Sequence, residues 1–173
     1  GGRSISNSNG NRVGGGGGGA SPPLSPDTTT YGCTITACGR AGKWGVALEL
    51  VETMRQDGME PDISVFNAAL SACASVGRWK EAGKVLREMR NANTPPEVES
   101  YNALITACGR GGEWERALGV LQAMPGRGVC PDLVSFNACL AACGQAGRFT
   151  QARALLNQMR HGEARAGTST RVR

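Results

Sequence analysis

The sequence predicts an all-α fold, a right-handed α-solenoid of stacked helix-turn-helix hairpins, on three observations. Side chains of the same kind recur every 35 residues through four units. Each unit contains two stretches in which apolar residues follow a helical spacing. Each unit boundary carries the same turn chemistry, a proline followed by an acidic residue. The recurring sets are Tyr31, Phe66, Tyr101 and Phe136; Cys38, Cys73, Cys108 and Cys143; Trp44, Trp79, Trp114 and Phe149; Ala47, Ala82, Ala117 and Ala152; and Met54, Met89, Met124 and Met159.

The first helix of the first unit is expected over about residues 28–39, followed by a glycine-containing turn. Small side chains dominate this helix in the later units, as in the segments AALSACAS, ALITACGR and ACLAACGQ. Glycine suits the end of a helix because it adopts the left-handed backbone conformation without a steric penalty. The turn glycines recur with the same period, as Gly42, Gly77, Gly112 and Gly147.

The second helix is expected over about residues 44–55, with one apolar stripe along its length. A spacing of three and four residues places these side chains on one helical face. A single hairpin cannot bury the stripe, whereas stacked neighbours can, and stacking produces a one-dimensional superhelix. The stripe consists of Trp44, Ala47, Leu48, Val51 and Met54, and in the third unit of Trp114, Ala117, Leu118, Leu121 and Met124.

The unit boundaries follow from the proline and acidic residues, because proline cannot continue a helix and Asp caps the next one. We expect a repeat array over residues 26–161, preceded by a disordered Gly- and Ser-rich leader over 1–25 and followed by a disordered basic tail over 162–173. Phe149 and Leu156 would lack a following partner, so the chain is expected to be a segment of a longer array. The units are 27–61, 62–96, 97–131 and 132–166, and the last one decays towards its end.

The formal net charge of +5 lies mainly in the two ends of the chain. Residues 26–161 carry 14 Lys plus Arg against 13 Asp plus Glu, which leaves the array almost neutral. Bulk charge is therefore poor support for a nucleic-acid partner. No apolar run is long enough to span a membrane, so no membrane association is expected.

The residue types needed for catalysis or metal binding are sparse. The chain has one histidine, His161, and no CxxC pair, and Cys139 and Cys143 are four residues apart on a predicted helix. We interpret the period-locked cysteines as small core residues in a reducing compartment, with Cys33 and Cys130 incidental. The glycine run at 14–19 lacks the Lys-Ser or Lys-Thr of a phosphate-binding loop. We therefore expect no enzymatic activity, no cofactor, no metal and no small-molecule substrate.

Two units share a frame that resembles the pentatricopeptide repeat family. In the second unit it reads Pro61-Asp62, VFNAAL over 65–70, GRWKEA over 77–82 and Met89, and it recurs over 100–105, 112–117, Met124 and Pro131-Asp132. The resemblance covers all four units. It implies sequence-specific binding of single-stranded RNA, one base per repeat, in organelle RNA processing, stability or translation in the mitochondrion or chloroplast. A tryptophan that opens the second helix departs from the family's usual aliphatic residue, and we expect it to pack in the core.

The resemblance also implies the base-reading residues. In the family one reader follows the aromatic residue of the first helix, and the second is the acidic or polar residue at the unit's end. An Asn–Asp pair in the family favours uracil, so we expect a weak preference for uracil and pyrimidines. The third unit should prefer uracil, the second less so, and the first should discriminate poorly. The pairs are Gly32 with Asp62, Asn67 with Glu97 and Asn102 with Asp132, and Asn137 would pair with Gly167, where the repeat has decayed.

Other family positions match only in part. A basic residue near the end of the first helix commonly meets the RNA backbone, and an aliphatic residue three before the reader packs against a base. The matches are Arg40 and Arg110 for the backbone and Val134 for base packing, whereas Ser75, Gln145, Thr29, Ser64 and Glu99 depart. The departures lower the expected RNA affinity. The alternative function is a protein–protein interaction scaffold, which the nearly neutral array also suits.

Overall fold

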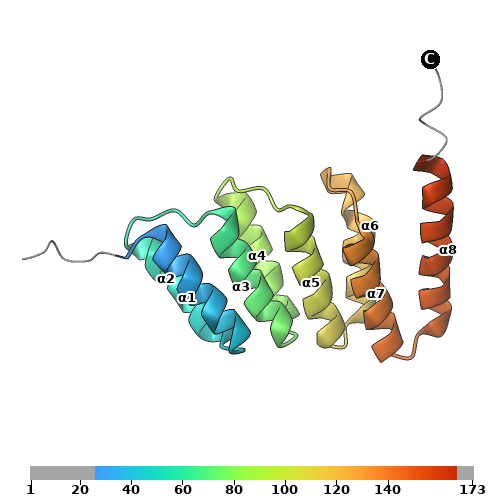
Figure 1. Ribbon diagram of the computed structural model, residues 1–173, viewed down its shortest axis with the longest axis horizontal. Coiled ribbons are helices and arrows are strands. Elements are labelled where there is room, and N and C mark those ends of the chain that lie inside the picture. Colours follow the sequence, from blue (N-terminus) through green and yellow to red (C-terminus); the bar gives the residue numbers. More distant parts are fainter. Residues whose placement is uncertain (1–25, 167–173) are drawn as a thin grey trace, which may run out of the picture.

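The described part of the chain forms four helical hairpins, which Figure 1 shows arranged in a row. The structure is a computed structural model that describes the backbone of residues 26–166 and the side chains of residues 26–160. The predicted leader, and residues 167–173 of the predicted tail, lie outside the described residues. Within the described part there are eight α-helices, one short 3₁₀ helix and no strand. The α-helices are α1 (Thr28–Arg40), α2 (Trp44–Gln56), α3 (Ile63–Ser75), α4 (Trp79–Asn91), α5 (Val98–Arg110), α6 (Trp114–Ala123), α7 (Leu133–Gln145) and α8 (Phe149–Ala166).

The first helix of three units begins at an aspartate that follows the boundary proline. Each aspartate accepts a hydrogen bond from the backbone N–H three residues later, which satisfies one of the free donors at a helix start. The distances are 2.7 Å from Thr30 to Asp27, 2.9 Å from Val65 to Asp62 and 2.8 Å from Ser135 to Asp132. The proline and acidic residues therefore act as the predicted boundaries.

Residues with positive φ follow the helices in both kinds of turn, the turn within a hairpin and the turn between one hairpin and the next. The predicted turn glycines have positive φ, for example 74° at Gly77 between α3 and α4. A second set follows the outer end of each hairpin, where Asn93, with φ of 55°, takes the place held by Gly58 and Gly128. Asparagine tolerates this conformation better than most residues, which explains why it replaces glycine there.

The third and fourth units depart from the common pattern at their second helices. Helix α6 ends at Ala123 because Pro125 cannot continue it, and a 3₁₀ turn, η1 (Pro125–Arg127), follows. Helix α8 continues to Ala166, five residues past the end at 161 that we expected for the array. None of the helices in residues 26–166 is long and apolar enough to cross a membrane.

The helices form two layers with different packing. The first helices, α1, α3, α5 and α7, pack directly on one another, and we call them the inner layer. The second helices, α2, α4, α6 and α8, form the outer layer, and within the described residues their backbones do not approach one another as those of the inner helices do. Outer helices meet through side chains, such as the Arg55–Glu88 pair, 3.6 Å apart, between α2 and α4. Small residues permit the close approach, since a Cβ added to Gly109 would lie 3.0 Å from the Cβ of Ala142. The stack is therefore the predicted solenoid of hairpins.

The core consists largely of the residues that recur with the period. Phe66, Ala82 and Met89 of the second unit are fully buried, and most of their counterparts are buried too. The three tryptophans are half-buried and pack against the core, as expected. At the last unit Phe149 is 74% exposed and Leu156 48% exposed, which confirms that these two side chains lack a covering partner in the described part of the chain.

Candidate nucleic-acid interface

The predicted reading positions all lie on the inner layer, one turn into each first helix. Asn67, Asn102 and Asn137 are the fifth residues of α3, α5 and α7, and Gly32 is the fifth residue of α1. Their predicted acidic partners are the N-cap residues of the following inner helix. Because inner helices are neighbours, the reading positions of the first three units lie beside the start of the next unit.

The junction between the third and fourth units brings its predicted pair into direct contact. The Asn102 Nδ2 donates to Asp132 Oδ1 at 3.1 Å. Asn102 is only 8% exposed, so its amide is held in place rather than free in solvent. Asp is an acceptor only, and the bond therefore fixes which end of the amide faces it.

Ser135 closes this contact into a ring. Its hydroxyl donates to Asn102 Oδ1 at 2.5 Å and accepts from the Asp132 backbone N–H at 3.2 Å. The Ser135 backbone N–H donates to Asp132 Oδ1 at 2.8 Å. Among the described residues no buried side-chain nitrogen or oxygen lacks a hydrogen-bond partner. A fully satisfied network of this kind is rigid, because each bond reinforces its neighbours.

The electrostatics of Asp132 follow from the same ring. Burial acts to raise the pKa of Asp132, but the hydrogen bonds from Ser135 and Asn102 outweigh it and hold the pKa below its ordinary value. A carboxylate that accepts several hydrogen bonds is stabilised in its charged form. Asp132 is therefore ionised at neutral pH.

The junction between the second and third units is built differently. The Ser100 hydroxyl donates to Asn67 Oδ1 at 2.7 Å, as Ser135 does to Asn102. However, the Asn67 Nδ2 lies 3.5 Å from Glu99 Oε2, and no hydrogen bond joins Asn67 to Glu97 among the described side chains. The structure thus does not join this predicted pair by a hydrogen bond. The Glu97 side chain is exposed and one carbon longer than Asp, so it is less constrained.

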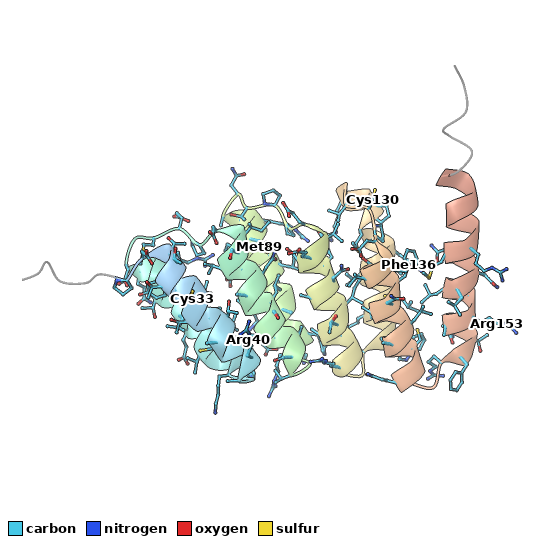
Figure 2. The ribbon with its side chains drawn as sticks, in the orientation of Figure 1. Cys33, Arg40, Met89, Cys130, Phe136 and Arg153 are labelled. Carbon is cyan, nitrogen blue, oxygen red and sulfur yellow. The ribbon has the colours of Figure 1, made fainter. Side chains whose placement is uncertain are left out.

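The first junction has no polar reader. Gly32 lacks a side chain, and Val65 occupies the register of Ser100 and Ser135, 3.9 Å from the position of an added Cβ. Gly32 and Asp62 line a common open hollow of about 600 Å³ together with Arg40. Figure 2 shows Arg40 at the end of α1, beside α3. This arrangement leaves space where the later units have a fixed amide.

The fourth unit has two exposed candidates. Asn137 is exposed on α7, and Gly167, where its partner would fall, lies outside the described residues. Val134 is 57% exposed near the start of α7, where it is accessible to a ligand.

The two candidate backbone arginines line one hollow on the inner layer. Arg40 of α1 and Arg110 of α5 border an open space of about 510 Å³, which Ser71 of α3 and Thr106 of α5 also line. Arg110 Nη1 also donates to the carbonyl oxygen of Ser75 at 2.8 Å. This bond satisfies the end of α3, so Arg110 stabilises the junction between units in addition to any contact with a ligand.

The tryptophans lie in the other layer, away from these positions. Each is covered by a cation from the following unit: Arg78 lies 4.8 Å from the Trp44 ring centroid, Arg116 lies 4.2 Å from Trp79 and Arg148 lies 5.1 Å from Trp114. Because each is partly buried and stacked by arginine, the three rings pack between units.

Sequence reasoning missed Ser100 and Ser135. The position just before the aromatic residue of each first helix also recurs every 35 residues. It is occupied by Thr30, Val65, Ser100 and Ser135. A serine near a helix start is ordinarily interpreted as a local cap, and both serines also accept the N–H of their N-cap residue. Their bond to the preceding unit is a feature of the stack alone.

Stacked two-helix units with this period define the chain as a helical-repeat protein of the α-solenoid class. Models of pentatricopeptide repeats match it over nearly all of the described length: the pentatricopeptide repeat domain over residues 84–146, the PPR repeat family over 26–74, and the PPR repeat over 64–94 and 134–162. The chain belongs to the pentatricopeptide repeat family. No curated protein sequence matches it.

Solved structures agree with this assignment. The crystal structure of pentatricopeptide repeat protein PPR10 from maize matches with 30% identity and a TM-score of 0.70, over 82% of this chain and 20% of that chain. PPR10 in complex with an 18-nt psaJ RNA element matches with 32% identity and a TM-score of 0.72, over 81% of this chain and 21% of that one. This chain thus spans about a fifth of the length of PPR10. The PPR domain of Arabidopsis thaliana protein-only RNase P 1, in complex with tRNA, shares the fold at 18% identity and a TM-score of 0.65, over 79% of this chain and 72% of that one.

Proposed function

We propose that the chain binds single-stranded RNA along its inner layer, with one base read at each unit. The observation that carries this proposal is the hydrogen bond of 3.1 Å between Asn102 and Asp132, which links the two predicted readers across a junction. The likeness to PPR10 supports the choice of ligand, because that protein was crystallised with RNA.

The chemistry of the third unit favours uracil. With one N–H given to Asp132 and one lone pair taken by Ser135, the Asn102 amide retains one donor and one acceptor site. Uracil presents a donor at N3 beside a carbonyl acceptor, which this amide complements. The second unit offers the same amide on Asn67 with a less constrained acidic partner, and the first unit has no amide at Gly32. The overall preference should be weak and directed to pyrimidines.

The nearly neutral array implies few phosphate contacts. Affinity for single strands falls with salt at a slope of about −0.7 per neutralised phosphate, so the salt dependence should be shallow. Arg40 and Arg110 are the inner-layer cations that we assign to the RNA backbone, and Val134 is assigned to base packing. We assign binding rather than catalysis to the array. By family, the cellular role would be organelle RNA processing, stability or translation, in the mitochondrion or chloroplast.

The test is a titration of fluorescently labelled oligo-U and oligo-A with the whole chain at low salt. Tighter binding of oligo-U is expected, because the amides on Asn67 and Asn102 are its proposed readers. Equal binding of the two oligonucleotides would contradict base reading. Capture of a protein that survives nuclease treatment and high salt, together with no RNA binding, would favour the alternative function as a protein scaffold.

A further inference from the structure

The first helices of the third and fourth units each carry, as their third residue, a serine that bonds to the preceding unit. Ser100 and Ser135 are both fully buried, and their hydroxyls bond the amide oxygens of Asn67 and Asn102 at 2.7 and 2.5 Å. We infer that these serines are positioning residues that lock the orientation of the reading amide in the preceding unit, an inference that rests on the proposed function.

The direction of each bond follows from donor and acceptor chemistry. Ionised Asp132 accepts only, so the Asn102 amide must turn its nitrogen towards it and its oxygen towards Ser135. Ser135 accepts the Asp132 N–H, and its single hydroxyl proton faces two acceptors, Asn102 Oδ1 at 2.5 Å and Asp132 Oδ1 at 2.9 Å, of which the amide oxygen is nearer. A flipped amide would place its oxygen against the carboxylate oxygen, with two acceptors facing each other. The ring thus permits one orientation.

A fixed amide orientation matters because uracil and cytosine present opposite patterns. At N3 and the neighbouring exocyclic group, uracil offers a donor and an acceptor, whereas cytosine offers an acceptor and a donor. Rotating an amide by half a turn exchanges its own donor and acceptor. A locked amide therefore separates the two pyrimidines, and an unlocked amide accommodates both. The serine hydroxyl, which never touches the base, would set this specificity.

The junctions differ in how far they depend on serine. Asn102 is held by Ser135 and by Asp132, whereas Asn67 is held mainly by Ser100, because its other contact, to Glu99, is 3.5 Å long and exposed. The first junction has Gly32 and Val65, so it lacks both the amide and the hydroxyl. The hydroxyl is thus present at the two described junctions where the preceding unit has an asparagine. Loss of Ser100 should affect discrimination more than loss of Ser135.

Matched variants separate the hydroxyl from the shape of the side chain. Valine and threonine are nearly the same size, so the two variants differ mainly in the hydroxyl, and Val65 already occupies this register beside Gly32. We would compare Ser100→Val with Ser100→Thr, and Ser135→Val with Ser135→Thr, in the whole chain. Circular dichroism would confirm helical content before binding is measured.

Two readouts test the inference. In the first, the ratio of oligo-C to oligo-U dissociation constants should fall by about fivefold or more in Ser100→Val and less in Ser135→Val, with Ser100→Thr close to wild type. The second readout is solvent exchange of side-chain amide protons, measured by NMR without RNA. Exchange should be faster for Asn67 in Ser100→Val and for Asn102 in Ser135→Val, and unchanged in the threonine variants. Unchanged ratios, or unchanged exchange in the valine variants, would overturn it. If wild type binds neither oligonucleotide, the proposed function fails, and the exchange measurement alone decides whether the serines lock the amides.

Discussion

The guanidinium carbon of Arg116 lies 4.2 Å from the ring centroid of Trp79, across the junction between the second and third units. At the other two junctions the covering arginine is Arg78 or Arg148. Each directly precedes the aromatic residue that opens the second helix of its own unit. Glu113 occupies that register in the third unit, and Arg116 replaces the missing cation from one turn further along α6. The backbones of the outer helices do not approach one another in the described part, so side-chain contacts of this kind connect neighbouring outer helices.

Replacing Arg116 with leucine should weaken the stack. Leucine keeps apolar contact with Trp79 but removes the cation, which should lower the free energy of unfolding by about 0.5–1 kcal/mol. The ion pair of Arg116 with Glu113 is exposed and should add little. Urea denaturation would measure the effect, with Arg87→Leu on the exposed face of α4 as the control. An equal loss in both variants would argue against a specific contribution from the Trp79 contact.

Two glycines in the same unit should respond to alanine in opposite directions. A Cβ at Gly111 would lie 2.8 Å from the Gly77 carbonyl oxygen and 2.9 Å from Trp79, so Gly111→Ala should destabilise by about 1–3 kcal/mol. Gly119 lies inside α6 with nothing within 4 Å of an added Cβ, so Gly119→Ala should stabilise by about 0.5–1 kcal/mol. Thermal unfolding followed by circular dichroism would show the two shifts, and a gain of stability in Gly111→Ala would be inconsistent with the packing at Gly77.

Removing the Asn102 amide should weaken RNA binding. Asn102→Ala should cost about 1–3 kcal/mol in affinity for oligo-U, in line with other base-edge contacts. The matched control is Asn157→Ala on α8, in the outer layer, which should leave affinity unchanged. Fluorescence anisotropy with labelled oligo-U would measure both. A similar loss in the two variants would indicate that the inner-layer position of Asn102 has no special role.

The Asn102–Asp132 contact should persist on acidification to below the ordinary pKa of an aspartate. Because hydrogen bonds in the folded chain hold the pKa of Asp132 below that value, its contribution to stability is present above about pH 4 and is lost as the pH falls through the folded pKa. The side-chain amide shifts of Asn102 should therefore change only at more acidic pH. Asp132→Asn should abolish that change. A midpoint above the ordinary value would contradict the ring of hydrogen bonds.

The cysteines should divide into reactive and protected sets. Cys33 and Cys130 are exposed and should react with a maleimide in the folded chain. Burial raises the pKa of Cys73 and Cys108 to about 11 and that of Cys139 to about 12, so these thiols should react only after unfolding. Mass spectrometry before and after addition of denaturant would count the labelled sites. Rapid labelling of Cys139 in the native chain would show that the junction between α5 and α7 opens.

Most of the fold could be predicted because the period reports directly on packing. Each unit repeats the same contacts, so Phe66, Ala82 and Met89 are buried for the same reason as their counterparts. Local chemistry also placed the helix starts at Asp27, Asp62 and Asp132. The end of α6 could not be read from the period, because Pro125 belongs to one unit only.

The site was less predictable because its contacts join different units. The pairing of Asn102 with Asp132 followed from the family pattern, whereas the role of Ser135 depends on how close α7 lies to α5. Glu97 illustrates the limit, since an acidic residue at the expected position is not hydrogen-bonded to Asn67, whose described partners are Ser100 and Glu99. Arg110 bonds the end of α3 and also lines the inner-layer hollow with Arg40, so its structural role could not be separated from its predicted one on sequence alone.

The close packing of Gly109 against Ala142 has a consequence for length. Helices whose backbones nearly touch cannot be brought closer or moved apart without loss of packing contacts. The spacing between neighbouring inner helices is therefore fixed. The separation of Asn102 and Asn137, which lie on α5 and α7, is set at this contact. A polymer that binds along the inner layer must therefore have a distance between its own repeating groups that matches the distance between units. Any mismatch between the two distances would accumulate with each added unit.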